Sequence, residues 1–142
     1  MGFSLSAATA IIGLSILISI ELIVSTSIPT VTNIHDSYEE MRDRSIDRLQ
    51  TDINITDINT SPNGSNYDLT FVVGNKGATS LKLEYFTVLI NGNLSSYTSS
   101  KTYLYPENTA EFSVLNIDGG GNERLKVITN NGISEYTNFV VP

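Results

Sequence analysis

The sequence predicts a mainly β protein, in which an N-terminal transmembrane and stalk α-helix precedes an immunoglobulin-like antiparallel β-sandwich. Three observations support this prediction. Residues 3–28 contain a single ionisable side chain and are otherwise dominated by aliphatic residues. Residues 29–50 keep a helical spacing of apolar side chains. Residues 51–142 change to the period-two alternation of β-strands, with turn signals between the strands. We therefore expect a span at 3–28, a juxtamembrane stalk helix at 29–50 and a sandwich at 51–142.

The apolar segment is long enough to cross a bilayer. As a helix its roughly 26 residues measure about 39 Å, against a hydrocarbon core of about 30 Å. A carboxylate at the helix centre costs roughly 2.5–3.5 kcal/mol, whereas the Phe, Leu, Ile and Val side chains together return about 4–8 kcal/mol. Insertion is therefore favoured, and a span that starts near Phe3 places Glu21 at its far boundary. The span residues are Phe3, Ile11, Ile12, Leu14, Leu17, Ile20, Glu21 and Leu22.

The start of the chain bears on whether this segment is cleaved. The residues before it include no Lys or Arg, and no A-x-A site follows it, which argues against a secretory signal peptide. A pilin-type leader ends in a basic residue and Gly, whereas Gly2 follows Met1 directly. We expect an uncleaved segment. Three roles for Glu21 stay open: placement at the membrane boundary, pairing with a partner helix, and a pilin-like pairing with a neighbour's N-terminal amine.

The stalk begins at Pro29, which we expect to end or kink the helix. Beyond it, Ile34, Tyr38, Met41 and Leu49 recur at helical spacing and form a narrow apolar stripe. This stripe would pack either on a neighbouring stalk, in a homo-dimer or larger homo-oligomer, or on the protein's own sandwich.

Charge alone does not fix the membrane orientation. The positive-inside rule applied to Arg42, Arg44 and Arg48 would place the C-terminal part in the cytoplasm. These arginines alternate with several carboxylates, and the acidic, Asn-, Ser- and Thr-rich remainder suits a solvated exterior domain. Four N-x-S/T glycosylation sequons give weak support to an exterior location, at Asn54, Asn59, Asn63 and Asn93.

The C-terminal part reads as seven to eight short strands. NG dipeptides and Gly-, Asn- and Pro-rich stretches separate runs of alternating apolar residues, as in antiparallel hairpins. Ile58 continues the first run only after a phase shift. The edges of such a sandwich suggest strand-edge pairing or face-to-face dimerisation. The expected core residues are Ile53, Ile55, Ile58, Tyr67, Leu69, Phe71, Val73, Leu81, Leu83, Phe86, Val88, Ile90, Phe112, Val114, Leu125, Val127, Phe139 and Val141.

Several kinds of chemistry are excluded or disfavoured. A net charge of −7 argues against nucleic-acid binding, and the absence of cysteine excludes disulfides and thiolate chemistry. The single histidine, His35, lies on the stalk, so neither a Ser-His-Asp triad nor a zinc site is expected in the sandwich. Asp118, Asn122 and Glu123 offer oxygen ligands for calcium, but their spacing favours a flexible hairpin loop. We expect no enzyme activity, cofactor or metal.

The opening MGFSLSAATAII, the single span, the charged SYEEMRDR and the small sandwich together resemble archaellum accessory protein F (the FlaF/ArlF family). The resemblance covers the whole chain in organisation and about 14 residues in motif. It implies a membrane protein with its sandwich in the pseudoperiplasm, where it would bind the S-layer, form a dimer and act as a stator of the archaellum motor. The sister accessory protein G is a candidate partner and also the runner-up assignment, because Glu21 departs from a uniformly apolar span. Archaellin or a minor pilin, assembled through the N-terminal helix, is a further alternative, as is a generic anchored adhesion module.

Overall fold

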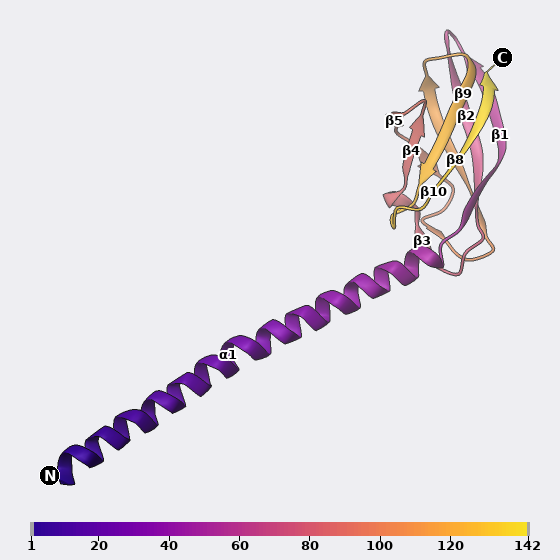
Figure 1. The fold of residues 1–142 in the computed structure, drawn as a ribbon. Helices are drawn as coiled ribbons and strands as arrows, with labels where there is room; N and C mark the ends of the chain where they lie inside the picture. The colour runs from indigo at the N-terminus through magenta and orange to yellow at the C-terminus, as the bar shows by residue number, and fades with distance from the viewer. Residues whose placement is uncertain (1, 142) are drawn as a thin grey trace. The chain divides into compact units, whose positions relative to one another are not determined.

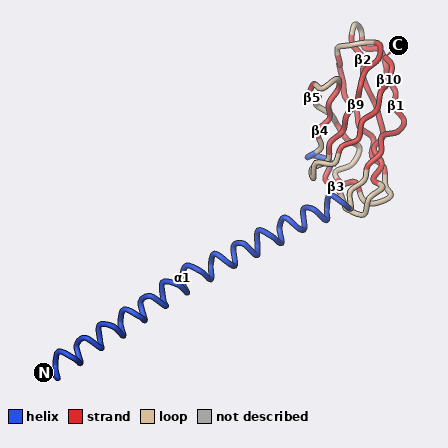
Figure 2. Tube along the Cα trace, viewed as in Figure 1, coloured by secondary structure: helices blue, strands red, loops and turns tan. Residues whose placement is uncertain are grey.

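The computed structural model describes residues 2–141, with side chains from Ser4 onward (Figures 1 and 2). The chain divides into two compact units, residues 1–43 and residues 44–142. The first unit is helical. The second contains the end of the same helix and all of the strands.

Helix α1 runs without interruption from Gly2 to Leu49, and Pro29 lies inside it. Of the two expectations for Pro29, an end of the helix is wrong, and a kink stays a prediction. A proline within a helix removes the backbone hydrogen bond to the carbonyl four residues earlier, here that of Ser25. The hydroxyl of Thr30 donates to the carbonyl oxygen of Thr26 at 2.7 Å, and that of Thr26 donates to Leu22 at 2.7 Å. These hydroxyls add hydrogen bonds to the helix on either side of Pro29.

The strands form two antiparallel four-stranded sheets, so the predicted fold class is confirmed. Eight strands make these two sheets, and β3 and β7 form a separate two-stranded sheet. One sheet has the order β1-β2-β8-β6 and the other β10-β9-β4-β5. The elements are β1 (Ile53–Asn63), β2 (Asn66–Asn75), β3 (Leu81–Lys82), a 3-10 turn (Leu83–Tyr85), β4 (Thr87–Ile90), β5 (Asn93–Ser95), β6 (Thr98–Ser99), β7 (Tyr103–Leu104), β8 (Thr109–Ile117), β9 (Gly121–Ile128) and β10 (Ser134–Val141).

The core lies between the two sheets and consists of the inward residues of both. All the predicted core residues are buried except Ile55 and Ile58, which are partly buried against the core. Phe112 lies at an aromatic cluster, with ring centroids 5.3 Å from Phe71, 5.9 Å from Phe86 and 5.3 Å from Tyr97. Leu104 and Ala110, which were not among the predicted core residues, are also buried.

A β-bulge in β1 explains the phase shift seen in the sequence. The ladder with β2 pairs Thr56 with Val72 and then Asn59 with Thr70, so Asp57 and Ile58 oppose the single residue Phe71 and one residue of β1 is extra to the ladder. Asp57 has a φ of 51°, a left-handed conformation that Asp tolerates better than most residues. The bulge therefore changes which residues of β1 point outward.

The end of the helix is joined to the sandwich within residues 44–142. The amide of Ala78 donates to the Gln50 carbonyl at 2.8 Å, and those of Lys76 and Gly77 donate to the Asp52 carbonyl at 2.8 and 3.1 Å. The loop after β2 therefore supplies backbone donors to the residues that follow the last helical turn.

The turn between β9 and β10 contacts the same region. The Asn131 side-chain amide donates to the Thr51 hydroxyl at 2.5 Å and to the Asp47 carbonyl at 3.4 Å. The Thr51 hydroxyl donates in turn to the Asp47 carbonyl at 2.7 Å. Two segments far apart in the sequence therefore hold the last turn of the helix.

Candidate functional site

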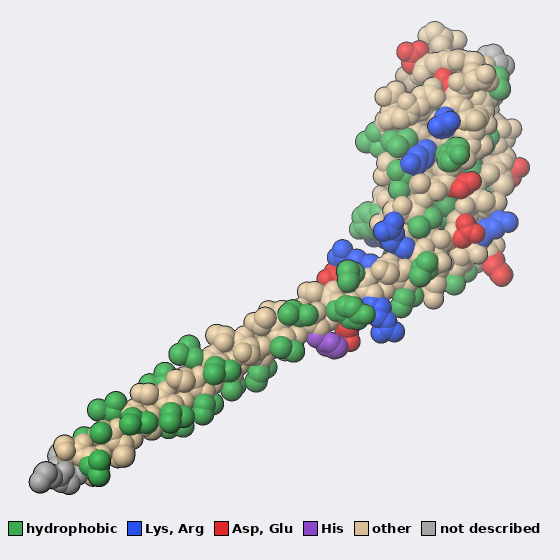
Figure 3. All heavy atoms as spheres, in the orientation of Figure 1, with side chains coloured by type: hydrophobic (Ala, Val, Ile, Leu, Met, Phe, Trp, Pro, Cys, Tyr) green, Lys and Arg blue, Asp and Glu red, His purple; other side chains and the backbone are tan. Residues whose placement is uncertain are grey.

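The first candidate site is the apolar half of α1. Within the described residues, one helix is long and apolar enough to cross a membrane, with a mean hydropathy of 2.3 in its most apolar window. None of that window is buried in the protein, so this helix is not a core helix of the sandwich. Figure 3 shows hydrophobic side chains around this part of the helix. The segment is compatible with single-pass membrane anchoring.

The predicted span residues lie on this helix, and those whose side chains are described are exposed. Leu17 and Leu22 expose 65% and 60% of their surfaces. A continuous exposed apolar surface of this kind is unfavourable in water. Glu21 is exposed among them. Phe3 belongs to the helix, and its side chain lies outside the described residues.

Hydroxyl side chains within the apolar segment are satisfied internally. The hydroxyl of Ser15 donates to the Ile11 carbonyl at 2.8 Å, and that of Ser19 donates to the Ser15 carbonyl at 2.7 Å. An unpaired hydroxyl in hydrocarbon costs several kcal/mol, roughly 4–8 on a cyclohexane scale. This back-bonding makes the polar residues of the segment compatible with a bilayer.

The second candidate site is the apolar stripe of the stalk. Ile34, Tyr38 and Met41 expose 64%, 62% and 60% of their surfaces. Together with Thr30, Asn33 and Ser37 they line a shallow groove of about 500 Å³ along the helix. His35 lies beside this stripe, with its Nε2 3.3 Å from Oε1 of Glu39.

The sequons occupy two different places on the sandwich. Asn54, Asn59 and Asn63 all lie on β1, opposite outward-facing residues of β2 in the ladder. Asn54 and Asn59 are five residues apart and share a face only because the β-bulge lies between them. Asn93, the fourth sequon residue, is exposed at the start of β5. Glycosylation of these four residues stays a prediction.

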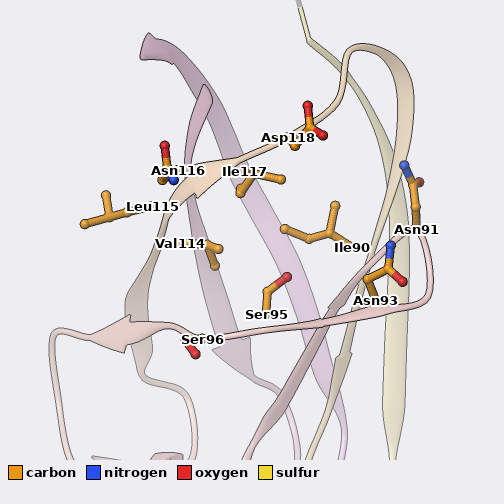
Figure 4. A pocket seen from close by; sticks show the side chains of 10 residues that line it. All are labelled: Ile90, Asn91, Asn93, Ser95, Ser96, Val114, Leu115, Asn116, Ile117 and Asp118. Carbon is orange, nitrogen blue, oxygen red and sulfur yellow. The ribbon is translucent and has the colours of Figure 1, made fainter. Parts of the chain in front are cut away.

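A cleft of about 430 Å³ opens beside Asn93, between the ends of β4, β5 and β8. Figure 4 shows the side chains of Ile90 and Ile117 facing each other across it, with Asn91 and Asn93 at one end. The ladder of β6 reaches β8 only at Phe112 and Ser113. Beyond that point β8 pairs with β2 alone among the described residues, which leaves an open strand edge. The sequence predicts such edges without identifying which strands form them.

Of the three oxygen-bearing residues considered for calcium, Asp118 precedes β9, whereas Asn122 and Glu123 lie within it. The carboxylate of Glu123 is 4% exposed and accepts a hydrogen bond from the Tyr67 hydroxyl, across the interior of the sandwich. Burial and this hydrogen bond raise the pKa of Tyr67. Among residues 2–141, no three His, Asp or Glu side chains gather closely enough to hold a metal. The sequence missed this pairing because the two residues are 56 positions apart.

The outward face of β9 carries two basic side chains, Arg124 and Lys126. The Arg124 guanidinium lies 5.2 Å from the centre of the Tyr136 ring, and its Nε donates to Asn138 Oδ1 at 3.3 Å. A cation over an aromatic ring is attracted to its face. Figure 3 shows basic side chains beside hydrophobic ones on the visible face of the sandwich.

These features define a class of protein: among the described residues, one long apolar helix precedes an antiparallel β-sandwich with apolar and basic patches on its surface. No protein-family model matches the chain. No curated protein matches it either.

Two archaellum structures are among the solved structures that are similar in fold. The archaellum periplasmic stator protein FlaG from Sulfolobus acidocaldarius is 18% identical, with a TM-score of 0.52 over 63% of this chain and 99% of that one. The archaeal flagellum of Methanospirillum hungatei strain JF1 is 15% identical, with a TM-score of 0.73 over 95% of this chain and 92% of that one. At these identities the likeness establishes the fold.

Proposed function

We propose that this protein is a non-enzymatic component of the archaellum, with its helix in the cell membrane and its sandwich in the pseudoperiplasm. In this proposal residues 3–28 span the lipid bilayer, and residues 29–50 continue the same helix as a stalk. The sandwich binds the S-layer and acts as a stator for swimming motility. Accessory protein G and a second copy of the chain are its proposed partners in the membrane.

The observation that carries this proposal is the likeness to FlaG, whose chain matches over 99% of its length within 63% of the present chain. The remaining N-terminal residues form an exposed apolar helix. A motor exerts torque on a filament only if a second part of it is held still. A membrane anchor joined to an exterior domain that grips a surface lattice meets this mechanical requirement.

The experiment that tests this proposal is co-sedimentation of the full chain, in detergent micelles, with isolated S-layer. Saturable binding is expected, and a variant with Arg124→Glu and Lys126→Glu tests whether the basic face of β9 contributes. Absence of binding across a range of pH and calcium concentration would overturn the S-layer role. Micelles without protein, and micelles with an unrelated single-span protein, are the controls.

A filament subunit is the second candidate, because the likeness to the Methanospirillum hungatei flagellum extends over 95% of the chain, helix included. In that case the apolar helix would drive assembly and Glu21 would contribute to it. Intact-mass measurement separates the two: an uncleaved N-terminus is expected for the stator. Cleavage within the first residues, together with loss of assembly in Glu21→Gln, would favour the filament subunit.

A further inference from the structure

We infer that the face of α1 running from Leu17 to Met41 is a parallel two-stranded coiled-coil seam, and that its partner is the same face of a second copy of this chain. The parallel arrangement rests on the proposed membrane anchoring, because helices inserted from the same side point the same way. The seam itself rests on the spacing, exposure and shape of the residues along the helix.

The spacing follows a heptad. Residues separated alternately by three and four positions form one stripe on a helix, and supercoiling keeps that stripe facing its partner. Between Thr30 and Asp43 every Val, Ile, Leu, Met and aromatic residue belongs to this stripe. The same spacing continues towards the N-terminus, where only Ser27 interrupts an apolar series. The complete set is Leu17, Ile20, Val24, Ser27, Val31, Ile34, Tyr38 and Met41.

The other positions of the heptad support the same arrangement. The carboxylates Asp36, Glu39, Glu40 and Asp43 all fall on the side of the helix away from the stripe. Pro29 also lies at the outermost heptad position. The proline ring and the missing backbone hydrogen bond are therefore directed away from the seam.

The stripe has the shape that knobs-into-holes packing requires. A knob from one helix enters a hole formed by residues at i, i+3, i+4 and i+7 of the other. Ile34, Ser37, Tyr38 and Met41 have this spacing and line the groove of about 500 Å³ on the stalk. In a parallel pair in register, the Tyr38 ring of the second copy is the knob that meets this hole.

Membrane insertion would also set the register. Two copies spanning one bilayer have their stalk residues at the same height, so each stripe residue faces its own counterpart. The next two positions of the heptad are Ser45 and Arg48. A polar residue and a pair of facing cations would end the seam before the sandwich, so each sandwich remains available to its own partner.

The test is disulfide cross-linking of the full chain in lipid vesicles. Because the sequence contains no cysteine, each introduced thiol can form a disulfide only with its counterpart in another copy. Ile34→Cys, Tyr38→Cys and Met41→Cys place a single thiol on the seam, while Asp36→Cys and Asp43→Cys place one on the opposite side. After mild oxidation, we expect about tenfold more covalent dimer from the seam variants, because a disulfide needs Cβ atoms about 4 Å apart. Equal yields from both sets, or no dimer from the seam set, would overturn the seam.

A second measurement guards against unfolding of a single variant. Met41→Glu should lower the cross-linking yield of Ile34→Cys several-fold, because two facing carboxylates repel each other in the seam. Asp43→Ala, on the opposite side, should leave that yield unchanged. If Met41→Glu has no more effect than Asp43→Ala, the seam is contradicted.

The same vesicles separate failure of the seam from failure of the membrane anchor. Washing with alkaline carbonate removes peripheral proteins and leaves spanning proteins in the lipid. If the protein is retained in the lipid and the seam and opposite-side cysteines cross-link equally, the seam is contradicted and the anchor is not. Release by carbonate contradicts the anchor, and the difference between the two cysteine sets in the released protein still decides whether the seam exists.

Discussion

At the scale of single residues, the Tyr67 hydroxyl and the Glu123 carboxylate form a polar contact within the sandwich interior. Both residues are nearly inaccessible, with 1% and 4% of their surfaces exposed. Gly119 lies directly over the carboxylate, where a Cβ would collide with Oε1 of Glu123. The contact therefore joins β2, β9 and the loop that precedes β9.

Replacing Tyr67 with Phe should destabilise the sandwich by about 1–3 kcal/mol, because it leaves a buried carboxylate without its donor. Chemical denaturation monitored by circular dichroism measures this change. Tyr136→Phe, which alters an exposed ring of the same type, should have little effect. A loss of stability no greater than that of Tyr136→Phe would show that solvent satisfies Glu123.

Asp68 makes the stability of the sandwich sensitive to acid. Its Oδ1 accepts hydrogen bonds from the Asn116 backbone amide at 2.8 Å and from the Asn63 side chain at 3.1 Å. These bonds lower the pKa of Asp68 from its usual value of 3.8. Because the folded-state pKa is depressed, the stabilisation is complete above about pH 4 and is lost as the pH falls through the folded-state pKa.

Asp68→Asn should therefore lower the melting temperature at neutral pH, and its difference from the unsubstituted protein should shrink below about pH 4. Thermal melts at a series of pH values make this comparison. Glu111→Gln removes the same charge from the adjacent strand without touching these hydrogen bonds and is the matched control. A pH-independent difference for Asp68→Asn would contradict the assignment.

At the scale of elements, the joint at the end of α1 depends on Gly77. A Cβ at this position would lie 2.2 Å from the Gln50 carbonyl oxygen and 2.6 Å from the Asp52 nitrogen. Backbone atoms cannot yield as a flexible side chain can. The loop after β2 therefore approaches the helix end as closely as it does only because residue 77 has no side chain.

Gly77→Ala should cost about 1–3 kcal/mol of folding free energy, the range for overpacking a tight site. Gly120→Ala is the matched control, since nothing lies within 4 Å of its Cβ position and its φ is not in the positive range. Amide hydrogen exchange should also locate the loosening at Ala78, whose amide donates to Gln50. Equal stability for the two variants would mean that the loop shifts without penalty.

The elements that the sequence predicted well were those with a strong local pattern. Alternation identified the core face of each long strand, and Asn91-Gly92 forms the tight turn between β4 and β5, with φ values of 51° and 85°. At Pro29 the local rule for proline allowed an end or a kink, and the helix does not end there. The helix joint and the Tyr67–Glu123 contact depend on long-range pairing, which carries no signal in a single sequence.

At the scale of the whole molecule, the division at residues 43 and 44 makes a prediction about truncation. A fragment that begins at residue 44 keeps Asp47, Gln50 and Thr51, and with them the contacts to Ala78 and Asn131. A fragment that begins at residue 53 contains every strand and loses all of these contacts.

The fragment 44–142 should melt at nearly the same temperature as the fragment 31–142. The fragment 53–142 should melt about 10 °C lower or more, because several hydrogen bonds of about 1 kcal/mol each are removed from a domain of this size. Calorimetry of the three fragments decides the point. Identical melting of all three would mean that the joint adds nothing to the stability of the sandwich.

The position of Asn131 in the chain also bears on the order of biosynthesis. The apolar helix is synthesised before the sandwich, and the turn that carries Asn131 is synthesised after strands β1 to β9. Under the membrane anchoring proposed above, the helix would enter the bilayer before the sandwich is complete. The last turn of the helix gains its contact with Asn131 only once that turn has been made.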